Sequence, residues 1–598
     1  MVKKAKEIER PSMVSWLDLG QVRKTALEVG ISTILGRHSD KRLFQSLATS
    51  GDDKGSCYYE VIGRDNQEFW FDYVADVGDG FNSTYSIAYH LAQDTLTLKE
   101  NKKGAQEYGT QRGDLLIFGG DEVYPLATQQ DYKDRLIGPY LAAFPEAKGN
   151  NLKDRPFACA IPGNHDWYDS LVEFSRLFRS ERSFCGWNTF QGRSYFAVKL
   201  PRGWWMFATD MQLASSLDDP QVEYFKEVMK DVADDDRIIL CNAEPYWITE
   251  KMYEKDKTYV NRGMGFFEGH VLEEKVAIYI AGDWHYYRHH EYDRTTKGTP
   301  PPDKSNRHKI VAGGGGAFLH PTHKAQVDEI GKNHVYKQKA CFPNERTSFW
   351  LTFWNLGFVF WNWKFGVITG LLYLLTAQAF FAKLGAFEGG LSGQNTTQVI
   401  TTFLSEPMAA VWVTITVVGF YFFADSHSRI NRWVAGMLHG SAHLAAMLAI
   451  GLIVSQLFFH EPTQNTSIWR IVAAALVIFL TGGVVGSTIM GLYLLISLNL
   501  MGVHHNEAFT SIKIEDYKNF LRLRIDKNGD LTIFPVGIRR VTKGWTPYDS
   551  RKTPRIEPEE QSSQEKPFLI EEPFGYGKSY SSTRGDSMDL EIVKRPID

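Results

Sequence analysis

The stretch Asp114-Leu-Leu-Ile-Phe-Gly-Gly-Asp121-Glu-Val-Tyr124 decides the predicted fold. It is a short apolar run, typical of a buried strand, followed by two glycines, a carboxylate and, three residues later, a phenol. Glycine at the end of a buried strand lets a metal ion or a phosphate approach the backbone. The stretch therefore predicts a strand that presents Asp121 and Tyr124 as oxygen ligands.

Three other stretches repeat this arrangement of an apolar strand followed by polar side chains. They run from Phe69 to Asp79, from Phe157 to Asp166 and from Val276 to His285. Their strand-end side chains are Asp76, Asn164, His165, Asp166, Asp283 and His285. Four strands that present oxygen and imidazole ligands at one end of a sheet would build a single metal site. The sequence therefore predicts an α/β domain with a metal centre.

This ordered set resembles the calcineurin-like metallophosphoesterase family, specifically its purple-acid-phosphatase-like motifs. The family's DxG, GDxxY, GNH and GHxH elements are similar to Asp76-Val-Gly78, Gly120-Asp121-Glu-Val-Tyr124, Gly163-Asn164-His165 and Gly282-Asp283-Trp-His285. The resemblance covers about residues 67–320, closing with the glycine-rich stretch 311–320, and does not extend to the second half. It implies an α/β fold, a calcineurin-like four-layer α/β/β/α sandwich. It also implies that the protein hydrolyses a phosphomonoester or a phosphodiester.

The resemblance also implies how the ligands divide between two divalent metal ions. Asp121 would bridge the two ions. The first ion would also be held by Asp76, Tyr124 and His285, and the second by Asn164 and Asp283.

The second site departs from the family pattern at two positions. Asp283 stands where the family usually has a histidine, and Ala243 stands where another is usual. Asn242 or Glu244 is the candidate replacement for the histidine that is missing at Ala243. Mainly oxygen ligands suit manganese or magnesium better than zinc, although iron and zinc stay among the candidate ions. Whether the second site is intact is left open.

The chemistry of such a centre indicates phosphoester hydrolysis. Two cations about 3.5–4 Å apart can clamp a phosphate, lower the pKa of a bridging water and stabilise the leaving oxygen. His165 would protonate the leaving alkoxide or orient the phosphate, with Asp166 holding its other nitrogen. By contrast, Asp79 is expected to serve only the turn, and His289 and His290 are expected to lie on the surface.

Composition excludes other classes of function. The chain has 66 Lys and Arg against 70 Asp and Glu, for a net charge of -4, so a generic nucleic-acid partner is not expected. Its five cysteines have no CxxC spacing, and the basic start is followed by no apolar run. Both features predict reduced thiols and a first half that stays in the cytosol.

The second half contains long apolar runs with almost no charge. They are Leu371–Phe381 with its flanks, Met408–Ala424, Val434–Phe459 and Ile471–Met501. Because about 20 apolar residues cross a bilayer, these runs predict an all-α transmembrane bundle of about four helices. The tryptophan-rich stretch from Ser348 to Trp363 is expected to lie at the membrane surface.

The loops between these runs predict the orientation. The first and third loops lack Lys and Arg up to Arg470, whereas the second contains Arg429 and Arg432. The positive-inside rule then predicts a multi-pass integral membrane protein, in contact with the lipid bilayer, with its catalytic domain and both termini in the cytosol.

Histidines within and beside the apolar runs form a second pattern. His439 and His443 are four residues apart and so share one helix face. The neighbouring polar residues are Asp425, His427, His504, His505 and Glu507. Two interpretations stay open: a metal or phosphate-head-group site, and hydrogen bonds to neighbouring helices.

The predicted organisation has six parts. They are an N-terminal helical segment (1–66), the metallophosphoesterase domain (67–325), a linker with the tryptophan-rich helix (326–365), the transmembrane bundle (366–503), a cytosolic β-hairpin (504–541) and a disordered tail (542–598). The predicted function is a membrane-anchored phosphoesterase whose substrate is a soluble or a membrane-associated phosphoester, a lipid included. The alternative is a non-catalytic sensor or scaffold on the same fold, which the two departures at the second site favour.

Overall fold

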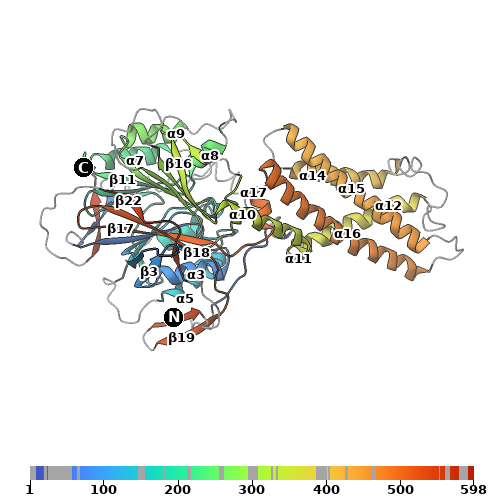
Figure 1. Cartoon of the computed structure of the whole chain (residues 1–598), viewed down its shortest axis with the longest axis horizontal. Coiled ribbons are helices and arrows are strands. Elements are labelled where there is room, and N and C mark those ends of the chain that lie inside the picture. Colours follow the sequence, from blue (N-terminus) through green and yellow to red (C-terminus); the bar gives the residue numbers. More distant parts are fainter. Residues whose placement is uncertain are drawn as a thin grey trace. The chain divides into compact units, whose positions relative to one another are not determined.

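The chain folds into two compact units. The computed structural model describes residues 8–18, 20, 23, 57–63, 67–145, 155–179, 183–211, 217–252, 254, 262–293, 307–324, 327–331, 334–384, 401, 405–424, 429–459, 467–550, 553–558, 566–577 and 590–597. The sheet unit comprises Met1–Val14, Thr25–Glu345 and Ile514–Asp598, and the helical unit comprises Ser15–Lys24 and Arg346–Lys513. Figure 1 shows the strands in the first and the long helices in the second. The predicted order of an α/β region followed by a helical region is confirmed.

The larger sheet has ten strands in the order β15-β16-β13-β14-β12-β11-β10-β9-β1-β23. The strands are β1 (Cys57–Ile62), β9 (Phe196–Leu200), β10 (Trp204–Ala208), β11 (Arg237–Asn242), β12 (Val276–Ala281), β13 (Tyr287–Tyr292), β14 (His308–Ala312), β15 (Glu329–Ile330), β16 (Tyr336–Phe342) and β23 (Glu591–Pro596). β10, β11, β12 and β14 are parallel neighbours, so the residues that follow them meet at one edge of the sheet.

The smaller sheet has nine strands in the order β21-β18-β17-β2-β5-β6-β8-β7, with β22 beside β18. The strands are β2 (Phe69–Val74), β5 (Leu115–Phe118), β6 (Phe157–Ala160), β7 (Ser183–Phe184), β8 (Trp187–Thr189), β17 (Lys518–Ile525), β18 (Leu531–Ile538), β21 (Phe568–Leu569) and β22 (Phe574–Tyr576). β2, β5 and β6 are parallel, and they deliver three of the four predicted ligand stretches to one edge.

Strand β2 shows how the core is built, because both of its faces are buried. Phe69, Phe71 and Tyr73 pack in a cluster with side chains from both sheets. Trp70 and Val74 point the other way, into a cluster shared with α3 (Phe81–Leu91), α5 (Gly138–Ala143) and α6 (Val172–Phe178). An apolar run without alternation is the pattern of a strand that is covered on both faces.

Shorter elements complete the sheet unit. They are β3 (Thr95–Lys99), β4 (Glu107–Gln111), α4 (Gln129–Asp131), η2 (Tyr132–Ile137), η4 (Asp166–Asp169), α7 (Asp219–Met229), α8 (Tyr246–Met252), α9 (Arg262–Phe266) and η5 (Phe267–Val271). Of the predicted N-terminal helical segment 1–66, the structure describes residues 8–18, 20, 23 and 57–63, and the last of these ranges contains β1. The rest of the predicted helical segment lies outside the described residues.

The hairpin predicted around Asn528-Gly529 completes the smaller sheet. Strands β17 and β18 pair with each other, and β17 pairs antiparallel with β2. A segment that follows the helical unit in sequence therefore contributes two strands beside the first ligand-bearing strand.

The prediction of a disordered tail after residue 542 is wrong for its described segments. β19 (Trp545–Ser550) pairs with β20 (Thr553–Pro558), β21 and β22 pair with β18, and β23 pairs with β1. The polar composition of the tail does not prevent the pairings of β21, β22 and β23, because a short strand that joins an existing sheet edge needs little apolar surface of its own. β19 and β20 form a two-stranded sheet of their own.

The helical unit consists mostly of long apolar helices. Its elements are α10 (Glu345–Leu351), η6 (Thr352–Gly357), α11 (Phe358–Trp361), α12 (Trp363–Leu384), α14 (Pro407–Phe423), α15 (Arg429–Phe459), α16 (Ile468–Ile496), η7 (Ser497–Met501) and α17 (His505–Thr510). Small residues let α12 and α16 approach closely: a Cβ built on Gly483 would lie 2.8 Å from the Gly366 carbonyl oxygen.

Two helices among the described residues are long and apolar enough to cross a membrane. They are Arg432–Phe459, with a mean hydropathy of 2.0, and Ile468–Met501, with 2.2. A third qualifies if the pair Glu345–Trp361 and Trp363–Ala379, bent by 62°, is one span. The apolar helix Pro407–Phe423 is shorter. The predicted count of about four thus exceeds the two or three that length and composition support here.

Candidate metal centre

Three carboxylates stand at the strand ends in an unusual backbone conformation. Asp76 follows β2, Asp121 follows β5 and Asp283 follows β12, and their φ angles are 57°, 54° and 66°. Positive φ is uncommon for residues other than glycine, and it occurs preferentially at functional sites. The backbone is therefore bent at the three points where the sequence predicts metal ligands.

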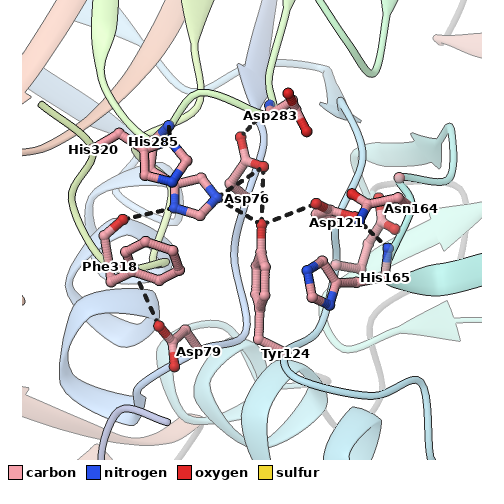
Figure 2. A network of polar contacts seen from close by, with 12 residues as sticks. Asp76, Asp79, Asp121, Tyr124, Asn164, His165, Asp283, His285, Phe318 and His320 are labelled. Atoms are coloured by element: carbon pink, nitrogen blue, oxygen red, sulfur yellow. Dashed lines mark hydrogen bonds and ion pairs between the residues drawn. The ribbon is translucent and has the colours of Figure 1, made fainter. Parts of the chain in front are cut away.

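The Tyr124 hydroxyl lies at the centre of the site. Its oxygen is 3.1 Å from Asp76 Oδ1, 3.0 Å from Asp121 Oδ2 and 2.9 Å from His285 Nε2. Figure 2 shows the Tyr124 ring pointing up between these side chains. Three of the predicted sequence elements therefore meet within hydrogen-bond distance.

Asp283 joins this group through its backbone. Its amide donates to Asp76 Oδ2 at 2.8 Å. Burial raises the pKa of Asp283, and the nearby charges of Glu244 and Asp121 raise it further. The fourth strand end thus lies beside the other carboxylates.

Glycines let the backbone lie directly against the carboxylates. A Cβ on Gly163 would be 2.0 Å from Asp121 Oδ1, and one on Gly313 would be 2.3 Å from Asp76 Oδ2. Both distances are too short for any side chain. The glycine of the GNH element and the glycine-rich stretch after β14 are therefore required by the site.

Two of the clustered carboxylates are deeply buried. Asp76 and Asp121 are 0% and 3% exposed. Burial and the neighbouring Asp166 raise the pKa of Asp121 to about 8, whereas burial, Asp121 and Asp283 raise that of Asp76. Acidic groups held this close ionise together only when a positive charge compensates them.

His285 is held in one orientation by its neighbours. Its Nδ1 donates to the Phe318 carbonyl at 2.7 Å, which leaves Nε2 facing Tyr124 and Asp76. Phe318 is fixed in turn by its amide, which donates to Asp79 at 3.1 Å, and His320 stacks on His285 with centroids 4.0 Å apart (Figure 2). Asp79 therefore does more than serve a turn.

The expected pair of His165 and Asp166 is wrong. His165 Nδ1 lies 2.9 Å from the Pro125 carbonyl oxygen, and its own amide donates to Asp121 Oδ1 at 2.9 Å. Burial lowers the pKa of His165 to about 4, so its ring is neutral, with the proton on Nδ1 and an acceptor at Nε2.

Asp166 instead fixes the loop that carries the GNH element. Its carboxylate accepts the Gly163 amide at 2.9 Å, the Glu122 amide at 3.3 Å and the Tyr132 hydroxyl at 2.6 Å. Asp166 is fully buried. It thus acts on the site through the backbone around Asp121 and Asn164.

The second site is less complete than the first. Asn164 Nδ2 donates to the Tyr168 hydroxyl at 3.1 Å, and Glu244 Oε1 accepts from Thr249 at 2.9 Å. Asn242 is buried and accepts from Thr209 at 2.6 Å. The Ala243 methyl group, which offers no ligand atom, lies close to Gly120.

The donor set fits a divalent cation in its chemistry. Carboxylates, a phenol, an amide and one imidazole are the ligands that manganese, magnesium and iron accept. Among the described residues, no three His, Cys, Asp or Glu side chains are already gathered around one point. An ion held here would draw these side chains closer than they lie in this structure.

The expectation that His289 and His290 lie on the surface is wrong. They are 2% and 0% exposed, because β13 is covered on both faces. His289 lies 2.9 Å from Glu571 of the C-terminal segment and 2.9 Å from His308. Neither histidine reaches the candidate metal centre.

The histidines of the helical unit form a separate buried cluster. His443 contacts the Tyr373 hydroxyl at 2.9 Å and His439 at 3.3 Å, and His439 stacks on Tyr493 with centroids 4.0 Å apart. His504 contacts the Tyr493 hydroxyl at 2.9 Å. His505 points to the Gly502 carbonyl, 2.9 Å away. The predicted neighbours Asp425 and His427 lie outside the described residues.

No protein-family model matches the chain, and no curated protein matches it. Among solved structures it is similar to GAP50, the anchor in the inner membrane complex of Plasmodium, at 10% identity and a TM-score of 0.28, over 42% of this chain and 74% of that one. It is also similar to the purple acid phosphatase PPD1 of yellow lupin, Lupinus luteus, at 14% identity and a TM-score of 0.30, over 47% of this chain and 49% of that one. A third similar structure is PhoD, at 11% identity and a TM-score of 0.25, over 46% of this chain and 63% of that one. At such low TM-scores these likenesses carry no conclusion about this chain.

Proposed function

We propose that the sheet unit is a metal-dependent phosphoesterase. The observation that carries this proposal is the Tyr124 hydroxyl, which lies within hydrogen-bond distance of Asp76, Asp121 and His285. These side chains come from distant parts of the chain, and no structural need for so many buried acids is evident. Burying acidic groups close together lowers the stability of a fold, so a place that gathers them at strand ends is a candidate functional site.

The proposed ligand roles are those that the resemblance to the metallophosphoesterase family implies. Asp76, Asp121, Tyr124 and His285 would hold a first divalent ion, and Asp121, Asn164, Asp283 and Glu244 would contribute to a second. Bound ions would supply charge that stabilises a phosphate and its leaving oxygen. Neutral His165 offers Nε2 as a proton acceptor or as an orienting group, whereas Asp166 keeps the loop in place.

The experiment uses the full-length protein in detergent with manganese, an aryl phosphate and an aryl phosphodiester. Turnover by the wild type, its loss in Asp121→Asn and its retention in the surface variant Asp94→Asn would support the proposal. Asp94 is a suitable control because its side chain is mostly exposed. A wild type that is inactive with manganese, magnesium, iron and zinc contradicts it.

A non-catalytic sensor is the second candidate, favoured by Ala243 at the position of a missing imidazole. In that case the wild type would bind a phosphorylated ligand without turnover. Elemental analysis separates the two functions, because two ions per chain support the enzyme and none supports the sensor.

A finer proposal concerns the substrate and its location. We propose that the apolar helices hold the protein in a membrane, with the sheet unit and both termini in the cytosol, and that the preferred substrate is a membrane-associated phosphoester. Anchoring would raise the effective concentration of a phosphorylated head group near the site. The test compares vesicle-borne phosphatidic acid with a soluble aryl phosphate, both with the full-length protein reconstituted into the vesicles and with the same protein in detergent. A ratio of rates that is the same in both settings contradicts the lipid preference and leaves the phosphoesterase proposal untouched.

A further inference from the structure

A pocket lies on the outer face of the larger sheet, within the sheet unit. Its volume is about 410 Å³, which falls in the range of small-ligand sites. Its lining includes Trp247 of α8, Tyr279 of β12, Lys309 of β14 and Tyr336 of β16. None of these residues belongs to the candidate metal centre.

The strand pattern explains why these side chains meet. Ile278, Ile280 and Ile310 of β12 and β14 point into the core between the two sheets. Successive residues of a strand point to opposite faces, so Tyr279 and Lys309 face outward. They are direct partners in the parallel register of β12 and β14. The pocket is therefore fixed by sheet geometry.

Lys309 is surrounded by four aromatic rings. Its Nζ lies 4.4 Å from the ring centre of Tyr279, 5.0 Å from that of Tyr336, and 5.5 Å from those of Tyr246 and Trp247. Aromatic faces attract an ammonium group but accept no conventional hydrogen bond from it. Within the described part of the chain, no carboxylate lies within ion-pair distance of this ammonium.

The nearest acid is already occupied. Glu268 accepts the Tyr279 hydroxyl at 2.7 Å and also the Tyr246 hydroxyl. These two hydrogen bonds fix the Tyr279 and Tyr246 rings beside Lys309. Glu268 itself does not lie within ion-pair distance of Lys309. Lys309 is half-buried, and this burial lowers its pKa, whereas the charges of Glu268 and Glu250 raise it.

A second cation lies on the same side of the strand. Arg307 is two residues before Lys309, is 5% exposed and also lines the pocket. Its Nη2 donates to the Glu274 carbonyl at 2.6 Å, which fixes the guanidinium. Four acidic residues also line the pocket: Glu268 and Glu274 are half-buried, whereas Glu250 and Glu254 are exposed, and Glu254 pairs with Lys251 at 3.0 Å. The wall around Lys309 is therefore aromatic, with Lys309 and Arg307 as its cations and Glu268, held by two tyrosine hydroxyls, as the nearest acid.

We propose that this pocket binds a small organic oxyanion, a carboxylate or a phosphate group carried on a flat ring, with Lys309 Nζ as its anchor. The oxyanion supplies the acceptor that Lys309 lacks, and Arg307 adds positive charge beside it. The faces of Trp247, Tyr279 and Tyr336 pack against the ring. The site is separate from the candidate metal centre and does not depend on the proposed function.

The test titrates benzoate and phenylphosphonate into the full-length protein by calorimetry, in detergent with EDTA. The protein carries Asp121→Asn, so that the metal centre does not contribute. We expect saturable binding of at least one probe, weakened by about tenfold or more in Lys309→Gln because a hydrogen bond to a charged group is lost. Lys226→Gln is the matched control, since Lys226 lies outside the pocket lining and is already paired with Glu223 at 2.8 Å, and it should leave affinity unchanged. The probe that binds more tightly identifies the oxyanion class.

A second measurement keeps the proposal testable if Lys309→Gln does not fold. Acylation of Lys309 in the otherwise unchanged Asp121→Asn protein is followed by mass spectrometry, and the bound probe should slow it while leaving the acylation of Lys226, outside the pocket, unaffected. Absence of saturable binding by both probes overturns the proposal. Binding that Lys309→Gln leaves unchanged, or that gives Lys309 no protection, also overturns it.

Discussion

The Arg522 guanidinium donates two hydrogen bonds to the Asp72 carboxylate, at 2.8 and 3.1 Å, and both side chains are buried. The two residues are partners on β17 and β2. We expect Arg522→Met to lower the free energy of unfolding by about 3–5 kcal/mol, because it leaves an unpaired charge inside the protein. Denaturant unfolding of the full-length protein in detergent measures this loss.

Arg524→Met is the matched control on the same strand. Arg524 lies 3.6 Å from Glu68, and both side chains are about a third exposed, so about 1 kcal/mol or less is expected. Equal losses in the two variants would show that the buried pair is not special.

The hydroxyl of Tyr124 makes a second prediction possible. Tyr124→Phe removes the group that contacts Asp76, Asp121 and His285, and we expect metal affinity or turnover to fall by about 10–100-fold. Steady-state kinetics at several manganese concentrations measures both. Tyr140→Phe is the control, because the Tyr140 hydroxyl is buried and has no hydrogen-bond partner among the described residues. Comparable losses would contradict a special role for Tyr124.

Gly163 is predicted to tolerate no side chain. Gly163→Ala would place a methyl group 2.0 Å from Asp121 Oδ1, so Asp121 must move and metal-dependent turnover should disappear. Gly109→Ala is the control, since nothing lies within 4 Å of its added Cβ. Circular dichroism shows whether each variant is folded. A folded Gly163→Ala protein with full activity would refute the proposed position of Asp121.

The buried His90 predicts part of the acid sensitivity of the fold. Burial, and then the charge of Arg522, lower its pKa to about 4, whereas an unfolded histidine has a pKa of 6.5. The unfolded state therefore binds a proton first, so the stabilisation is complete above pH 6.5 and is lost as pH falls through this window to about 4. The loss is at most about 3 kcal/mol.

Unfolding measured between pH 7 and pH 4 tests this contribution. In His90→Gln the fall in stability over that range should be shallower than in the wild type, whereas His270→Gln should match the wild type because His270 is exposed. An unchanged slope in His90→Gln would exclude His90 as a source of the acid sensitivity.

The proposed orientation predicts which loops react from outside a cell. Thr396→Cys, between the first and second apolar runs, should react with a membrane-impermeant maleimide on intact cells. Ser426→Cys, in the loop with Arg429 and Arg432, should react only after permeabilisation, because basic loops stay in the cytosol. The reverse pattern would place the sheet unit outside.

The strand ends of the site were predictable because their signal is local. An apolar run, a glycine and a carboxylate within a few residues specify both the strand and the bend after it, as at Asp76 and Asp121. The sequence also shows the spacing from Asp121 to Tyr124. That Tyr124 and His285 share one site was expected only from the resemblance, and their direct contact depends on how the two sheets pack against each other.

The errors arise where a partner comes from the backbone or from a distant segment. Asp166 follows His165 directly, yet it binds backbone amides, while a carbonyl group takes the histidine nitrogen. His289 has the polar sequence context of a surface residue, but the C-terminal segment brings Glu571 against it. His320, which stacks on His285, gave only the weak signal of standing at the end of a glycine-rich stretch.

The position of β17 beside β2 has a consequence for how the protein is made. A ribosome releases β2, β5, β6 and β12 long before β17, and the main part of the helical unit, Arg346–Lys513, is synthesised in between. Until then Asp72 has no Arg522 and the edge of β2 is open. While the apolar helices are being synthesised, the nascent sheet unit therefore lacks β17 beside β2, and Asp72 lacks its ion-pair partner. Folding of the candidate enzyme is thus tied in time to the completion of its helical unit, and a chain that stalls within that unit would leave the sheet open to chaperones and proteases.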